Sequence, residues 1–268
     1  MRSLSEYLQA VIATVKRDAR ISLSYRLRLV AQILGGLLTL TVFFYVAKLA
    51  RPDAVGHRAS YYPFLVVGIL ALAMVESGLN LSLLVRLELV AGNFERILIS
   101  PFGPIGGVLA MAVFPITYAT VVSGITLLLA GAIYAVPVNI SAVPAALVVA
   151  AMGGTAFAAL GVLFVAALIA FKSSSGPVWV IAGLGLLGGI YFPVALFPGW
   201  IRWASDVQPL TPTVDLLRHL LVGAPSIEAR WLELLKLFGF VAVLLPLSGV
   251  VLGQAVGLSR RRGTIMEY

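Results

Sequence analysis

The chain has 268 residues, of which 60% are hydrophobic and 11% are charged, and its mean hydropathy is +1.04. A soluble domain is about 45–50% apolar and about 25% charged, so this composition excludes a water-soluble fold. The formal net charge of +8 is better explained by basic residues on the cytoplasmic flanks of membrane helices than by nucleic-acid binding. The sequence therefore predicts an integral membrane protein without a nucleic-acid partner.

The first 28 residues are predicted to form an amphipathic helix that lies along the cytoplasmic surface of the membrane. Apolar residues recur at helical spacing over residues 3–20, and basic side chains fall largely on the other side. Lys16, Arg17 and Arg20 precede the first long apolar run, which is the wrong order for a cleavable signal peptide. The alternative is a solvated leader that only anchors the chain.

Apolar runs then predict an all-α, polytopic membrane domain over residues 29–259. A crossing of the hydrocarbon core needs about 20 apolar residues. The 75 residues between Arg96 and Lys172 carry no charge, and a cluster of Pro, Asn and Ser at residues 137–144 divides them into two crossings. Six transmembrane helices are expected, at residues 29–50, 61–85, 105–135, 143–171, 178–192 and 234–258.

The stretch between the fifth and sixth expected spans differs from an ordinary loop. Residues 192–230 mix five prolines, among them Pro193, Pro198, Pro209 and Pro212, with two tryptophans and several apolar side chains. Short re-entrant or interfacial helices fit this composition, and irregular backbone at membrane depth must be covered by protein or line a water-filled cavity. The sequence thus predicts a vestibule here.

The distribution of basic residues predicts the orientation. With six spans, the side that carries both termini holds twelve Lys and Arg residues, including the basic tail at 260–268, and the other side holds seven. Both termini are therefore expected in the cytoplasm.

Glu76 is the only acidic residue well inside an expected span, and Asn80 follows it one helical turn later. A carboxylate at membrane depth is costly unless it is protonated, paired or facing water, so these two residues are candidates for a substrate path. One alternative is a proton-coupled secondary transporter that uses Glu76, although such carriers usually contain a relay of several groups. The other is a purely structural role, in which Glu76 holds helices together.

No energy-coupling or catalytic motif was found in this sequence. A Walker A loop requires a lysine after glycine, and none of the four lysines follows one, so the chain is not a P-loop ATPase. It contains no cysteine and two distant histidines, so neither a metal site nor a bound cofactor is expected. A lipid-modifying membrane enzyme would need clusters of acidic residues or histidines at the membrane interface, and this sequence shows none. A non-catalytic assembly subunit remains an alternative.

Two segments resemble type-2 ATP-binding-cassette (ABC) transporter permeases. In residues 86–101, an acid is followed by Gly, an apolar residue, a second acid and Pro, as in the cytoplasmic signature of that family, with Asn93 in place of the usual Thr. Asn also caps helix starts. The second segment is the Gly-Gly-Ile-Tyr-Phe-Pro run at 188–193 with its continuation to Arg218.

The resemblance implies an export pump in the plasma (inner) membrane of a prokaryote. Its permease subunit would pair with a second copy or a related permease, contact membrane lipid and couple to a separate nucleotide-binding subunit that holds ATP and Mg²⁺. By resemblance, the ATPase-coupling residues are Glu88, Gly92, Phe94, Glu95, Arg96 and Pro101, together with Lys16, Arg17 and Arg20. The outer-gate residues are Phe192, Pro193, Pro198, Trp200, Pro209 and Arg218.

Overall fold

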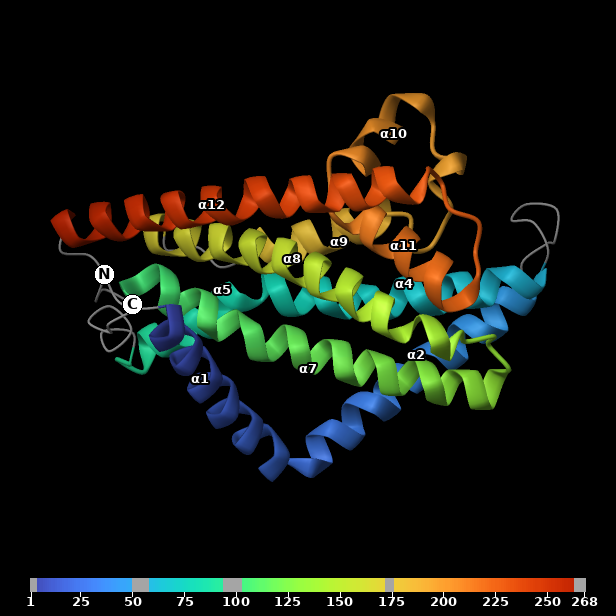
Figure 1. Cartoon of the computed structure of the whole chain (residues 1–268), viewed down its shortest axis with the longest axis horizontal. Helices are drawn as coiled ribbons and strands as arrows, with labels where there is room; N and C mark the ends of the chain where they lie inside the picture. Colours follow the sequence, from blue (N-terminus) through green and yellow to red (C-terminus); the bar gives the residue numbers. More distant parts are fainter. Residues whose placement is uncertain (1–3, 50–57, 94–102, 172–175, 263–268) are drawn as a thin grey trace.

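The computed structural model describes residues 4–49, 58–93, 103–171 and 176–262, and every regular element in these ranges is a helix. The longest helices run side by side along the long axis of the molecule (Figure 1). A helix satisfies its own backbone hydrogen bonds, which is what a segment in lipid requires. The expected all-α fold is therefore confirmed for the part of the chain that the structure describes.

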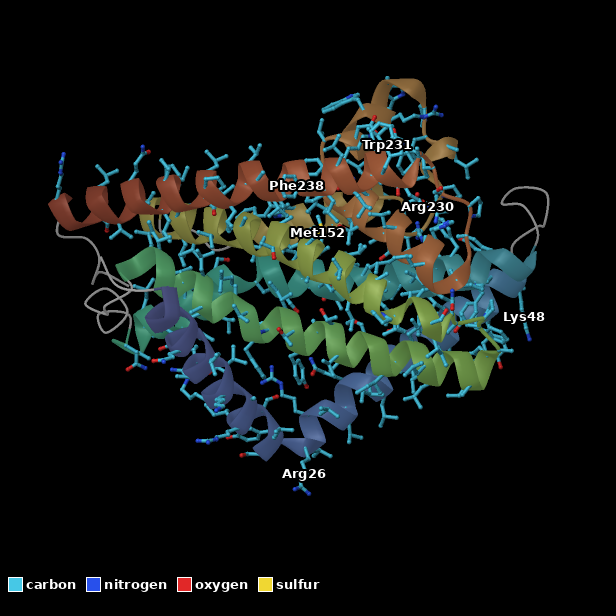
Figure 2. All side chains as sticks on the ribbon, in the orientation of Figure 1. Arg26, Lys48, Met152, Arg230, Trp231 and Phe238 are labelled. Carbon is cyan, nitrogen blue, oxygen red and sulfur yellow. The ribbon has the colours of Figure 1, made fainter. Side chains whose placement is uncertain are left out.

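Five segments of the described residues are long and apolar enough to cross a membrane. Four of them run along the helices α2 (Arg26–Leu49), α7 (Gly103–Tyr134), α8 (Val143–Phe171) and α12 (Arg230–Arg262). The fifth joins α4 (Arg58–Leu79) to α5 (Leu81–Val90). Figure 2 shows Arg26 and Lys48 at opposite ends of α2, as expected for the charged flanks of a span.

The remaining expected span differs most from the prediction. α9 covers Gly176–Leu187, only 12 residues, whereas residues 178–192 were expected to be helical. A helix of 12 residues is about 18 Å long. The backbone turns away at Gly189, where φ is +73°, so the residues after Leu187 do not extend the helix.

Two segments form the centre of the bundle. In the most apolar 18-residue stretch of each segment, 56% of α4–α5 and 61% of α8 is buried, against 6% for α2 and 11% for α12. α4 and α8 approach closely at glycines: a Cβ added to Gly78 would lie 2.7 Å from the carbonyl carbon of Phe157. Small residues permit this approach in membrane helices generally.

α1 (Leu4–Ser24) is a helix within the N-terminal stretch. It is separated from α2 by Tyr25 and packs against α7 as well as α2. The two helices form a V in Figure 1. Whether α1 lies on a membrane surface stays a prediction.

Short helices occupy the stretch before α12, and prolines precede three of them. Pro193 is at the start of η2 (Val194–Leu196), Pro198 of α10 (Gly199–Asp206) and Pro209 of α11 (Leu210–Val222). Proline suits a helix start because its missing N–H has no helical acceptor there. α11 ends at Gly223, whose left-handed conformation closes the helix.

Candidate functional site

We use two names for the ends of the bundle. At the terminal end, α5 ends, α7 begins and α12 ends; at the distal end, α7 connects to α8 through η1 (Ile140–Ala142) (Figure 1). The loop there is fixed to α11, because the Asn139 N–H donates to the Leu221 carbonyl at 2.7 Å.

Arg218 of α11 links three segments that are far apart in the sequence. Its Nε donates to the Phe64 carbonyl of α4, and its Nη1 and Nη2 donate to the carbonyls of Gly189 and Ile190, each at 2.9 Å. The side chain is only 2% exposed, and its guanidinium carbon lies 3.3 Å from the centre of the Phe64 ring. The planar fork of arginine can satisfy three acceptors in this way, whereas a lysine cannot fix the same geometry.

The pKa of Arg218 is lowered to about 9 by burial, an effect that the Asp215 carboxylate opposes. The guanidinium is therefore charged at neutral pH. Gly68 of α4 provides the space: a Cβ there would lie 2.5 Å from Arg218 Nη2.

Asp215 interacts with the Arg218 guanidinium and is one of several carboxyl groups, contributed by three helices, that we call, together with Arg218, the Arg218 cluster. Asp215 accepts from the Ile227 N–H at 2.8 Å and lies within hydrogen-bonding contact of Glu233 on α12. Lys236 Nζ lies 2.8 Å from Glu228 and 3.5 Å from Asp206 of α10. A pair of adjacent carboxyl groups is stable when it shares a proton. These contacts join α10, α11 and α12.

A cavity of about 310 Å³ opens beside this cluster. Its lining includes Tyr61 and Phe64 from α4, Pro193 and Val194 at the start of η2, and Arg218. The stretch at residues 192–230, which was expected to form a vestibule, thus meets α4 at this cavity. Among the described residues, no group of three His, Cys, Asp or Glu side chains is arranged to hold a metal ion.

The expected outer-gate residues are not all part of one site. Pro193 and Arg218 line the same cavity. Trp200, in contrast, is 76% exposed on α10, and Phe192 is also exposed. The sequence reasoning identified Arg218 but missed Asp215 and Glu233, although acidic residues among apolar ones were a usable signal.

Glu76 and Asn80 lie together on an exposed face of the α4–α5 segment. Leu83 and Leu87 of α5 continue this face and are also exposed. Helical spacing places it opposite the face of α4 that carries Met74 and Val67, which are buried in the core. A polar pair on an otherwise apolar span faces water or protein in preference to lipid.

The predicted coupling residues lie only partly within the described residues. Glu88 and Gly92 are at the terminal end, where the Glu88 carbonyl accepts from the Asn93 N–H at 2.9 Å and Gly92 has φ of +69°. Lys16, Arg17 and Arg20 are exposed on α1, and Arg17 pairs with Asp18 at 2.8 Å. Outside the described residues lie Phe94, Glu95, Arg96 and Pro101.

Comparison with protein families shows which family the chain belongs to. The family model described as ABC-2 type transporter matches residues 6–222, from α1 to the end of α11. The chain belongs to the ABC-2 type transporter family. No curated protein matches it significantly. This ABC-2 chain is thus a multi-pass membrane component of an ABC transporter, and its family implies a partner ATPase.

Proposed function

We propose that the chain is the permease subunit of an ABC export pump, paired with a second copy or a related permease. The observation that carries this proposal is the exposed Glu76–Asn80 face on a central span of an ABC-2 chain. A single subunit leaves that polar face uncovered. A second permease opposite to it would enclose a path that is shielded from lipid and bordered by both copies.

In this proposal, α9 completes the six spans and both termini are cytoplasmic, in the inner membrane of a prokaryote. The basic residues at the terminal end support this orientation, because cytoplasmic flanks carry the excess of Lys and Arg. The terminal end then faces the ATPase, with its ATP and Mg²⁺, and the distal end faces outward. The Arg218 cluster acts as the outer gate, because it connects α4, the turn after α9 and α11.

Coupling to the ATPase is assigned to the connection after α5. Movement of the ATPase can reach the spans only through a stiff element of the permease. α5 is such an element, because it is continuous with the central α4 except at Asn80. Gly92 and the residues that follow it are therefore the proposed contact with the ATPase, together with the exposed basic side chains of α1.

The deciding experiment reconstitutes the chain with the ATPase that co-purifies with it. ATP-driven export from the vesicles should persist when the proton gradient is collapsed. Transport that stops on collapse of the gradient, with ATP present, would instead favour a carrier that uses Glu76. Absence of both an associated ATPase and transport would favour an assembly subunit.

A single variant tests the coupling assignment. Glu95→Ala should leave membrane insertion and complex formation intact while ATP hydrolysis becomes uncoupled from transport. Unchanged transport for each ATP hydrolysed would show that Glu95 is not a coupling residue.

A further inference from the structure

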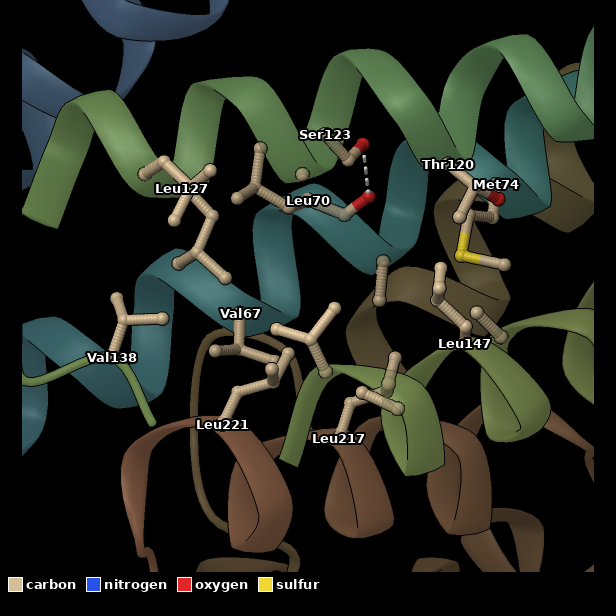
Figure 3. A pocket seen from close by; sticks show the side chains of 16 residues that line it. Val67, Leu70, Met74, Thr120, Ser123, Leu127, Val138, Leu147, Leu217 and Leu221 are labelled. Atoms are coloured by element: carbon tan, nitrogen blue, oxygen red, sulfur yellow. Dashed lines mark hydrogen bonds between the residues drawn. The ribbon is translucent and has the colours of Figure 1, made fainter. Parts of the chain in front are cut away.

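A second cavity, of about 150 Å³, lies between α4, α7, α8 and α11. Figure 3 shows its wall of apolar side chains, with Leu70 and Met74 from α4, Leu127 from α7 and Leu217 and Leu221 from α11. It is distinct from the Glu76–Asn80 face, which is on the opposite side of α4. It is also not part of the Arg218 cluster, which lines another cavity.

The cavity offers few polar partners to water. Its two hydroxyl groups already donate within the chain: Thr120 Oγ1 to the Ile116 carbonyl at 2.8 Å and Ser123 Oγ to the Leu70 carbonyl at 3.1 Å. A buried water needs about two to four polar partners, and an apolar cavity of about 150 Å³ stays dry and takes up apolar molecules. The apolar lining therefore favours a hydrocarbon as the occupant of the cavity.

The cavity opens toward the outside of the bundle between α7 and α8. Gly124 and Leu128 of α7 and Leu147 of α8 line it, and all three are exposed. The surface around this mouth is apolar as well, because the entire sequence from residue 97 to 171 carries no charge. In a multi-pass membrane protein, such a surface is covered by bilayer hydrocarbon.

We propose that the acyl chain of a membrane lipid enters between α7 and α8 and occupies this cavity. A second copy of the protein is a less suitable occupant, because the polar face that needs a protein partner lies across α4. The end of the acyl chain would contact Leu217 and Leu221 of α11. These two residues belong to the helical turn that also carries Arg218. A bound acyl chain therefore supports the helix that carries the gate arginine.

The test uses the full chain in nanodiscs of phosphatidylcholine that carries a photoactivatable diazirine near the end of one acyl chain. After irradiation, labelled peptides are mapped. Leu217 and Leu221 are at most 9% exposed, so lipid reaches them only through the cavity. Label on these residues is expected, together with label on Phe238 of α12, which is 61% exposed and reports ordinary contact with bilayer lipid.

Two matched variants test entry through the opening between α7 and α8: one blocks the opening and the other leaves it unchanged. A Cβ added at Gly124 or at Gly239 meets no atom within 4 Å, so both positions accept a side chain, but only Gly124 lines the cavity. Gly124→Leu should lower labelling of α11 about tenfold, a loss of about 1.4 kcal/mol of occupancy free energy. Gly239→Leu should leave it unchanged, and Gly124→Ala should retain most of it.

Three results would overturn the proposal. The first is an unlabelled α11 in the wild-type chain when Phe238 is labelled. The second is undiminished α11 labelling in a Gly124→Leu protein that elutes and melts like the wild type. The third is cross-linking of α7 or α8 to a second copy in place of lipid, which would show that protein covers the mouth. None of these outcomes depends on transport, so the proposed pump function is tested separately.

Discussion

Gly161 of α8 lies directly against Gly78 of α4, and a Cβ at Gly161 would overlap the Gly78 carbonyl oxygen. The backbones of the two most buried spans thus touch without an intervening side chain. A rigid central pair of this kind gives the peripheral helices α2 and α12 a common surface to pack on.

Gly161→Ala should lower stability, because the overlapping atoms belong to backbone and cannot rotate away. Overpacking of this type costs about 1–3 kcal/mol. Thermal unfolding in a mild detergent measures the effect, and Gly183→Ala is the control, since a Cβ at Gly183 meets no atom within 4 Å. Equal melting temperatures for the two variants would contradict the close approach of α4 and α8.

Arg218→Met should be severely destabilising, by about 3–5 kcal/mol, since it leaves three buried carbonyl groups without a donor. Arg202→Met is the matched control. Arg202 also donates to two carbonyls, Ala195 and Phe197, but on an exposed surface, where water replaces it. Folding stability of both variants is measured by thermal unfolding, and a loss for Arg202→Met as large as that for Arg218→Met would argue against the special role of the buried guanidinium.

Glu76→Cys tests whether the polar face borders a water-filled path. The chain contains no cysteine, so a single introduced thiol can be followed without background. Only a thiolate in contact with water reacts with a charged, membrane-impermeant maleimide. Glu76→Cys should therefore react at least about tenfold faster than Val148→Cys. Val148 is 60% exposed on the apolar surface of α8. Similar slow reaction at both positions would place Glu76 against lipid or protein.

Gly92→Ala should weaken coupling, because a positive φ costs an alanine about 1–2 kcal/mol. Gly92→Asn is the informative companion, since asparagine tolerates this conformation better and should retain more activity. The measurement is transport for each ATP hydrolysed in reconstituted vesicles. If alanine and asparagine were equally active, the conformation of Gly92 would not matter for coupling.

Long apolar runs were sufficient to predict most of the fold. α2, α7 and α8 begin and end within about three residues of the expected bounds, because the requirements of the hydrocarbon core act on local sequence. α12 is longer than expected at both ends. The short α9 was not predicted. Its helix gives way to a turn with the left-handed Gly189, where Gly188 packs against Leu210 of α11: a Cβ at Gly188 would lie 2.6 Å from the Leu210 side chain.

The candidate site was predictable only in part. Arg218 was found through resemblance, but its acceptors are 28, 29 and 154 residues away in the sequence, and no local pattern indicates such partners. Asp215 and Glu233 belong to different helices, and their contact depends on how α11 packs on α12. Glu76 stood out in the sequence because an acid inside an apolar span is rare, and the structure places it on an exposed face.

α9 also has a consequence for the membrane itself. Its length of about 18 Å falls well short of the roughly 30 Å hydrocarbon core. Hydrophobic mismatch of this kind is relieved by local thinning of the bilayer, at a cost of fractions of a kcal/mol for each ångström. In the proposed six-span arrangement, lipids beside α9 would therefore be compressed. Activity in vesicles should then depend on acyl-chain length.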